Sequence, residues 1–329
     1  MTGVQTCALP ICDCLNPSCW PVLERLTLAE KVRDLPHSKL CSVAFMAIDG
    51  REVSVDLPSG TDCEISVKRS LFDDLLLKRA CELGANVHEQ NTVTGLRRND
   101  HWNIDTSSGD SFRARILISA DGRNSTVAHL CNLLPRPARE RVALQAHVPL
   151  PRDFGNRIVL QFLREGYSGQ APVNETQLNL CLVGTPPTIS KLRRWAERQF
   201  RLPADQSWRT ITPLTRSSVP SAHENLFFIG DAARVVEPFT GEGIYYALRS
   251  GELAANATAE ILRGDDRKVV LNELRRAYAQ MYHGRLWINR LARAAVVRPQ
   301  LGSFFVHAAR VNPSILKLLT TKIVSASPR

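Results

Sequence analysis

The stretch NLFFIGDAARVVEPFTGEGIYYALRSGELAA, residues 225–255, decides the fold. Residues 226–229 are apolar and predict a buried strand, and Gly230-Asp231 follows at its carboxyl end, where open α/β sheets bind their ligands. The Asp231 carboxylate could accept hydrogen bonds from a sugar or polyol hydroxyl, and Gly230 would let a ligand come close to the backbone. The strand and its polar end therefore predict a ligand site in an α/β fold.

The second half of this stretch predicts a helix that begins at the same ligand site. Pro238 and the run TGEG, residues 240–243, lead into a helical sequence that starts at Ile244. The free N–H groups and the positive dipole end of such a helix would face an acceptor or a delocalised negative charge, and the O2/N1 edge of a reduced flavin offers both. Each half alone also fits a strand, a tight turn and a capped helix without a ligand. Together, at this spacing, they predict a flavin site.

An apolar run upstream supplies a second strand of this kind. Residues 116–120 predict an interior, parallel strand that ends in Asp121-Gly122. Asn124 or Ser125 would cap the helix that follows.

A helix is also predicted nearer the N-terminus. Residues 64–84 indicate a strand and then a helix, which Ser70 and Asp73 would open as a capping box and Gly84 would close.

The chain divides into regions of different character. Residues 12–135 and 223–262 predict a discontinuous, Rossmann-like domain of the α/β class. Residues 136–222 carry short alternating strands between turns rich in Pro and Gly, which predicts an antiparallel sheet inserted as a second domain. Residues 263–329 predict a helical C-terminal region with 13 Lys and Arg against three acidic residues.

Composition limits the partners and the compartment. The formal net charge of +10 and the pI near 9.4 suit an anionic partner, which could be a nucleic acid, an acidic membrane or a phosphorylated cofactor. No recognised nucleic-acid-binding module occurs, so we expect no nucleic-acid partner. Nine cysteines form no CxxC pair, which indicates a reducing, cytoplasmic interior without a metal site. No run approaches the roughly 18 apolar residues of a spanning helix.

Residues 225–255 resemble the second flavin fingerprint of the glutathione-reductase-type FAD enzymes, in the branch that holds para-hydroxybenzoate hydroxylase-like monooxygenases. Within that branch PFTGEGIYYALRSGELAA is most similar to the geranylgeranyl reductase family, and the resemblance runs from about residue 13 to the C-terminal helices. It implies that Asp231 holds the FAD ribityl chain. The residues that it places around the cofactor are Arg69, Asp121, Gly122, Gly230, Pro238, Gly241, Glu242, Gly243 and Ile244.

The same resemblance implies a substrate-lining segment in the inserted sheet. GYSGQAPV, residues 166–173, keeps the family's Tyr167 and Pro172 but has Gly169 and Ala171 where bulky aromatic residues would stand. A wider substrate pocket follows. Cys14 matches a position close to the flavin ring, and a buried structural cysteine is the alternative for it.

The first residues do not fit this family. A leading βαβ unit with GxGxxG should bind the pyrophosphate, yet the chain contains no such motif. Residues 1–11, MTGVQTCALPI, read like the translation of a sequencing adapter. We therefore expect an artefact fused to a chain that has lost this unit, with impaired FAD binding and exposed apolar sheet edges.

The sequence thus predicts an FAD-dependent oxidoreductase that passes a hydride from reduced flavin to a double bond of a lipid-like or isoprenoid substrate. NAD(P)H or another reductant would supply the electrons, and no side chain can be named as the general acid. The alternatives are a monooxygenase on the same fold and a non-enzymatic, basic nucleic-acid-binding protein. Residues 314–324, SILKLLTTKIV, could lie on an anionic membrane as an amphipathic helix or pack on their own domain.

Overall fold

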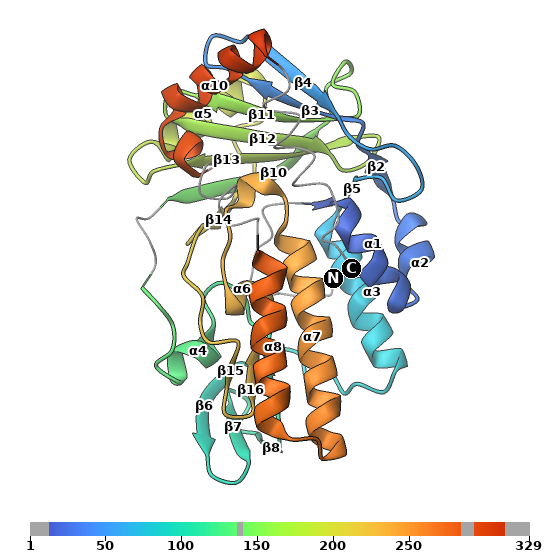
Figure 1. Ribbon diagram of the computed structural model, residues 1–329. Helices are drawn as coiled ribbons and strands as arrows, with labels where there is room; N and C mark the ends of the chain where they lie inside the picture. The colour runs from blue at the N-terminus through green and yellow to red at the C-terminus, as the bar shows by residue number, and fades with distance from the viewer. Residues whose placement is uncertain (1–12, 137–140, 284–292, 313–329) are drawn as a thin grey trace.

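The computed structural model describes residues 13–136, 141–283 and 293–312, which form two lobes (Figure 1). The predicted adapter-derived segment and the predicted amphipathic segment 314–324 lie outside these residues. One lobe is built on a large sheet, and the other holds the long helices and two of the small sheets.

The large sheet has seven strands, and most of its neighbours run antiparallel, as the sequence predicts. In spatial order they are β14 (Arg209–Ile211), β10 (Val142–Pro149), β13 (Gln177–Gly184), β12 (Gly166–Pro172), β11 (Arg157–Leu163), β3 (Ser42–Met46) and β4 (Glu52–Asp56). The pairing of β3 with β11 is parallel. Because β3 and β4 join this sheet, the predicted boundary needs correcting: residues 42–56 lie in the large sheet, which is the predicted substrate sheet.

The two faces of the large sheet bury different residues. Helix α5 (Ile189–Gln199) covers one face over Val148, Leu178 and Leu180. The other face carries Phe162 and packs against α10 (Pro299–Val311), where a Cβ on Gly302 would lie 2.3 Å from the Phe162 ring. Only glycine permits this close approach of helix and sheet.

The predicted parallel strand is confirmed. The strands β9 (Leu117–Ser119) and β16 (Leu226–Phe228) run parallel, with Ser119 beside Phe228, and β15 (Ala222–His223) adds an antiparallel edge. In the described part of the chain β9 pairs with β16 only, and Ile118 is 40% exposed. The prediction of an interior strand is therefore wrong for these residues.

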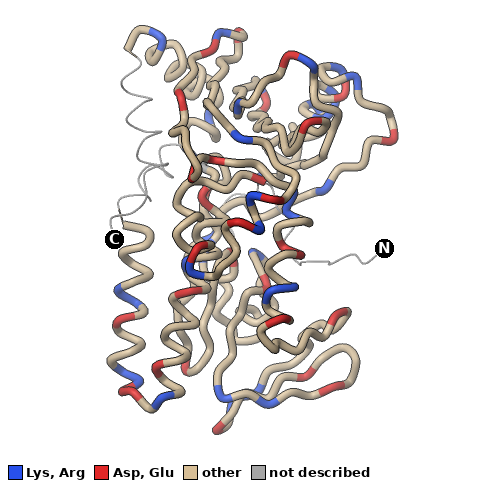
Figure 2. Tube along the Cα trace, turned by 90° about the vertical axis from the view of Figure 1, so that its right-hand side faces the viewer, with Lys and Arg blue, Asp and Glu red and all other residues tan. Residues whose placement is uncertain are grey.

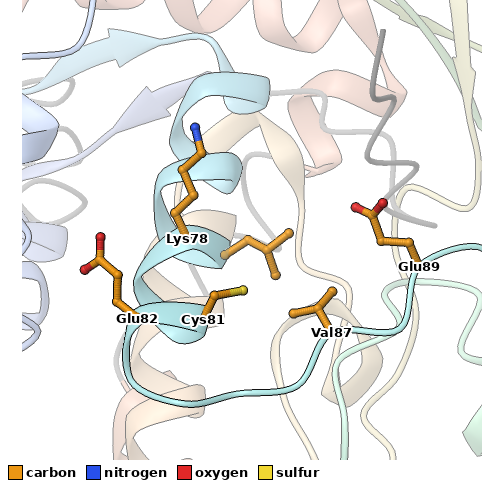
Figure 3. A pocket seen from close by; sticks show the side chains of 6 residues that line it. Lys78, Cys81, Glu82, Val87 and Glu89 are labelled. Atoms are coloured by element: carbon orange, nitrogen blue, oxygen red, sulfur yellow. The ribbon is translucent and has the colours of Figure 1, made fainter.

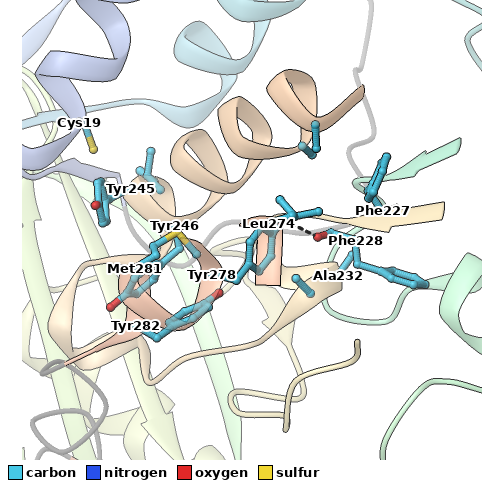
Figure 4. Close-up of a cluster of buried hydrophobic side chains, with 14 of the residues drawn as sticks. Cys19, Phe227, Phe228, Ala232, Tyr245, Tyr246, Leu274, Tyr278, Met281 and Tyr282 are labelled. Atoms are coloured by element: carbon cyan, nitrogen blue, oxygen red, sulfur yellow. Dashed lines mark hydrogen bonds between the residues drawn. The ribbon is translucent and has the colours of Figure 1, made fainter. Parts of the chain in front are cut away.

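Three helices follow β16 and cover it: α6 (Gly230–Ala233), α7 (Gly243–Arg263) and α8 (Arg267–Tyr282). Figure 4 shows aromatic residues of α7 and α8 packed together, with Tyr246 and Tyr282 ring centroids 4.8 Å apart. The Tyr278 hydroxyl donates to the Phe228 carbonyl at 2.8 Å, and its burial raises the pKa of Tyr278. This bond ties α8 to the strand that carries the Gly-Asp motif.

A third sheet lies between the lobes, with strands β1 (Cys14–Leu15), β5 (Ile65–Val67) and β2 (His37–Lys39). Its helices are α1 (Trp20–Arg25), α2 (Ala29–Arg33) and α3 (Arg69–Glu82). The predicted capping box at Ser70 is wrong, because α3 begins one residue earlier and Asp73 accepts from the Arg69 side chain at 3.0 Å instead. The predicted end is confirmed, since Gly84 follows the helix at φ +94°.

A meander completes the fold, with strands β6 (Val93–Arg98), β7 (Trp102–Thr106) and β8 (Ser111–Ala114). It packs beside α4 (Thr126–Leu130), which Ser125 caps as predicted. Figure 2 shows basic and acidic residues mixed along the described trace. Among the described helices, none has the length and apolar character needed to cross a bilayer.

Candidate functional site

Two polar turns meet at the carboxyl ends of the parallel strands. Asp121-Gly122 follows β9, and Gly230-Asp231 follows β16, so the register of the strands brings both motifs to one edge. Asp121 accepts from the backbone N–H of Val127 at 3.0 Å. The Asp-Gly motif thus has a local role at the start of α4, whatever else it binds.

An arginine that the sequence analysis did not single out joins the two turns. Arg123 Nη2 donates to Asp231 Oδ2 at 2.9 Å, and both side chains are largely buried. The second carboxylate oxygen, Oδ1, makes no hydrogen bond within the described residues. Asp231 is therefore held in place by one oxygen and can accept a ligand hydroxyl with the other.

The glycines around α7 leave room for a ligand. Gly230 has φ +55°, and a Cβ there would lie 3.3 Å from Cβ of Ala247, so the strand end sits directly on the helix. Gly241, at φ +68°, and Gly243 would place a Cβ with no described heavy atom within 4 Å. The N-cap residue Glu242 makes no side-chain cap, so the amides of Gly243 and Ile244, at the start of this 21-residue helix, can donate to an outside acceptor. This open cradle fits the ring and ribityl side of a flavin.

A buried ion pair anchors the segment that leads to the cradle. Arg141, just before β10, donates to Glu237 at 2.6 and 3.3 Å, and the side chains are 8% and 1% exposed. Glu237 directly precedes the 3₁₀ turn Pro238–Thr240. The pair therefore ties this segment to the start of the substrate sheet. No local pattern predicts this ion pair, because the partners are 96 residues apart.

Aromatic contacts bring the substrate sheet against the same segment. Phe239 lies in the 3₁₀ turn, and its ring centroid is 5.3 Å from that of Tyr167 and 6.0 Å from that of Phe162. The structure thus places Tyr167 beside the run that leads to Gly241. Pro172 is five positions further along β12, on the opposite face with Leu178, which corrects the prediction that it lines the same site.

The small residues predicted to widen the pocket lie on the face of Tyr167. A Cβ on Gly169 would meet only Leu160 among described atoms, at 3.7 Å. Ala171 pairs with Asn179 of β13, which in turn pairs with His147 of β10. A polar row on the neighbouring strands therefore begins beside Ala171.

This polar row is the feature that the sequence reasoning missed. Gln145 Nε2 donates to Asn179 Oδ1 at 2.9 Å, and His147 Nε2 lies 2.7 Å from Asp13 Oδ2. Alternation along β10 places Gln145 and His147 on the face of Ala143. The alternation along β10 was the signal in the sequence that Gln145 and His147 share a face, although no local pattern connected this face with Asp13.

Arg69 and Cys14 lie near this row. The Arg69 side chain pairs with Asp73 at 3.0 Å, and its backbone N–H donates to Asp13 at 3.2 Å. Cys14 is buried with Ala171, which fits the structural alternative for this cysteine. Neither residue contacts the Asp231 turn in any interaction that the structure describes.

The open pocket in Figure 3 is a separate feature. It is lined by Leu77, Lys78, Cys81, Glu82, Val87 and Glu89, at the far end of α3 and in the loop that follows. None of the predicted site residues lines it. Among the described residues there is also no group of acidic, His and Cys side chains that could hold a metal ion.

The fold defines the class of protein. The chain has the fold of the FAD-dependent oxidoreductases and monooxygenases. It matches the flavin-dependent brominase Bmp2 with a TM-score of 0.76 at 18% identity, over 98% of this chain and 86% of the brominase. It matches HpxO of Klebsiella pneumoniae, solved with FAD and uric acid, with a TM-score of 0.76 at 15% identity, over 97% and 88% of the two chains.

Proteins of similar sequence indicate a family within this class of FAD-dependent enzymes. The chain is 28% identical over 252 residues to the digeranylgeranylglycerophospholipid reductase of Methanosphaerula palustris, covering 68% of this chain and 61% of the reductase. It is 29% identical over 210 residues to an uncharacterized protein of Methanosarcina barkeri, covering 60% and 53%. The predicted resemblance to the geranylgeranyl reductase family is confirmed. The chain spans less than two thirds of the length of these relatives. No protein-family model matches it.

Proposed function

We propose that this chain is an FAD-dependent oxidoreductase that reduces a carbon–carbon double bond of a lipid-like, isoprenoid substrate. The observation that carries the proposal is the open cradle of Gly241 and Gly243 at the start of α7. Beside it in the sequence lies Asp231, whose carboxylate bonds Arg123 through Oδ2 and makes no described hydrogen bond through Oδ1. When bound, the reduced flavin supplies the hydride.

The residues of the chain bind and orient the cofactor. Asp231 accepts a hydrogen bond from a ribityl hydroxyl, and the amides of Gly243 and Ile244 donate to the ring edge where negative charge gathers. Glu237 and Arg141 hold the loop in register with the substrate sheet. We propose Arg69, Asp121, Gly122, Gly230, Pro238 and Glu242 as further residues around the cofactor, as the family resemblance implies. The chain has no GxGxxG for the pyrophosphate, so these contacts concern the ring and ribityl side.

The substrate face supports an apolar, bulky substrate. Tyr167, Phe45 and Phe162 surround Phe239 and give an apolar wall. Gly169 and Ala171 leave this wall without bulky side chains towards β13. An isoprenoid chain buries its methyl groups against such a face and gains about 0.8 kcal/mol for each buried CH₂.

A monooxygenase is the second candidate. The polar row of Gln145, His147 and Asn179 favours it, because a small polar substrate would find hydrogen-bond partners there. HpxO, which shares the fold, was solved with uric acid. Product analysis separates the two: a reductase consumes one reductant per saturated bond under nitrogen, whereas a monooxygenase needs O₂.

The electron donor and the place of action complete the proposal. A nicotinamide cofactor is the proposed reductant. A membrane surface is the proposed source of substrate, since α10, which belongs to the basic stretch of sequence 263–329, exposes Phe304 and Val311.

The first experiment is flavin binding. The fluorescence of riboflavin and of FAD should be quenched when each binds to the full chain. Asp231→Ala should lower the affinity for both by about ten- to a hundred-fold, since a hydrogen bond to a charged group is lost. Asp205→Ala, at an exposed turn, is the matched control and should bind like the unmodified chain. A folded chain that binds neither flavin, or an Asp231 variant that binds both equally well, would overturn the proposal.

A further inference from the structure

A buried carboxylate holds a histidine at the edge of the substrate face. Asp13 has a side chain only 3% exposed, and it is fixed by the Arg69 N–H at Oδ1, 3.2 Å away, and by His147 Nε2 at Oδ2, 2.7 Å away. Because a carboxylate accepts hydrogen bonds, Nε2 of His147 carries a proton. The bond sets the orientation of the ring, and Nδ1 makes no hydrogen bond within the described residues.

The histidine lies in register with Ala171, one of the small residues of β12. His147, Asn179 and Ala171 follow one another across β10, β13 and β12 on the face that carries Tyr167. Cys14, the neighbour of Asp13 in the chain, packs against Ala171. The ring of His147 is partly exposed, at 23% of its side chain, so a substrate can reach it.

Hydrophobic packing does not explain this arrangement. The opposite face at this level buries Val148 and Leu178, and His147 is not part of that cluster. Gln145 Nε2 donates to Asn179 Oδ1 at 2.9 Å and lies 3.5 Å from His147 Nε2, so the 2.7 Å bond to Asp13 is the shorter contact of this histidine. A histidine oriented by a buried carboxylate is the arrangement that proton transfer requires.

We propose that His147 is the proton donor of the reduction, and that Asp13 is the residue that positions it. This inference rests on the proposed function. The hydride adds to one carbon of the double bond, and the Nδ1 proton of the His147 imidazolium adds to the other. The π bond breaks, two C–H bonds form, and the flavin is oxidised by two electrons. His147 is left neutral, with its Nε2 proton retained and still donated to the Asp13 carboxylate, and a proton from water restores the imidazolium.

The first test needs no flavin. In a ¹⁵N-histidine spectrum of the full chain, His147 should give a downfield Nε2 proton that is protected from exchange. Asp13→Asn should remove this signal while the other histidines keep theirs. A wild-type His147 whose proton resides on Nδ1 alone would overturn the inference.

The second test follows turnover of farnesol with chemically reduced flavin. His147→Gln should bind flavin as the unmodified chain does and lose about a hundred-fold or more in turnover, the usual contribution of a general acid. His129→Gln, at an exposed position on α4, is the control and should keep full turnover. If the unmodified chain turns over and His147→Gln stays within threefold of it, the proton-donor role is wrong while the proposed function stands. If the unmodified chain binds no flavin, both fail.

Discussion

The proposed flavin side and the proposed substrate side of this site differ in how the chain builds them. On the flavin side, Gly230, Asp231, Gly241 and Gly243 come from one short stretch after β16. On the substrate side, Tyr167, Asn179 and His147 come from three strands and meet only through sheet register. A motif whose geometry is local is visible in the sequence, whereas a site assembled by pairing is not.

The Arg141–Glu237 ion pair connects the two sides, and the largest change in the free energy of unfolding is expected when it is broken. Replacing Glu237 with Ala should lower the free energy of unfolding by about 3–5 kcal/mol, because Arg141 is left buried without its carboxylate. Urea denaturation measures this.

An exposed pair provides the matched control. Glu52→Ala removes the partner of Arg157, 3.0 Å away and about one third exposed, and should cost less than about 1 kcal/mol. Equal losses in the two variants would mean that the Arg141 pair does not anchor the loop more firmly than an ordinary surface contact.

A buried acid directly before β5 predicts a pH dependence of stability. Burial raises the pKa of Glu64 to about 7, from 4.5. The folded chain therefore prefers the protonated form, so the free energy of unfolding should fall as the pH rises from 4.5 and level off above about 7. Glu64→Gln should remove this fall and stabilise the chain by about 3 kcal/mol at pH 8, with little change at pH 4.5. Urea titrations at both pH values measure it, and an equal effect at both would contradict the assignment.

The same contrast explains what the sequence could and could not predict. The parallel strand, the Gly-Asp turn and the helix after it follow from contiguous apolar runs and glycines. The assignment of residues 42–56 to the wrong lobe and the misplaced Pro172 both concern register and face, which depend on strands far away in the chain. The Asp13 to His147 contact spans 134 residues, beyond any local pattern.

The proposed substrate face can be tested by placing a large side chain at position 169. Gly169→Phe places its Cβ where only Leu160 lies within 4 Å among described atoms, at 3.7 Å. The added ring lies on the face of Tyr167 and should lower turnover of a twenty-carbon prenyl alcohol by about tenfold, while a ten-carbon one changes less. Kinetics on both alcohols measure it. Equal losses for the two lengths would place the chain of the substrate elsewhere.

The smallest effect is expected at the surface that would meet a membrane. Phe304 on α10 is 64% exposed, and Phe304→Ser should reduce partition onto vesicles with anionic lipid by less than about tenfold, because one aromatic side chain buries only part of its surface there. Leu83→Ser, equally exposed but at the far end of α3, is the control and should not change partition. Sedimentation with vesicles measures both. A loss of the same size in the two variants would show that general surface hydrophobicity, and not α10, governs binding to the vesicles. The substrate would then have to come from solution.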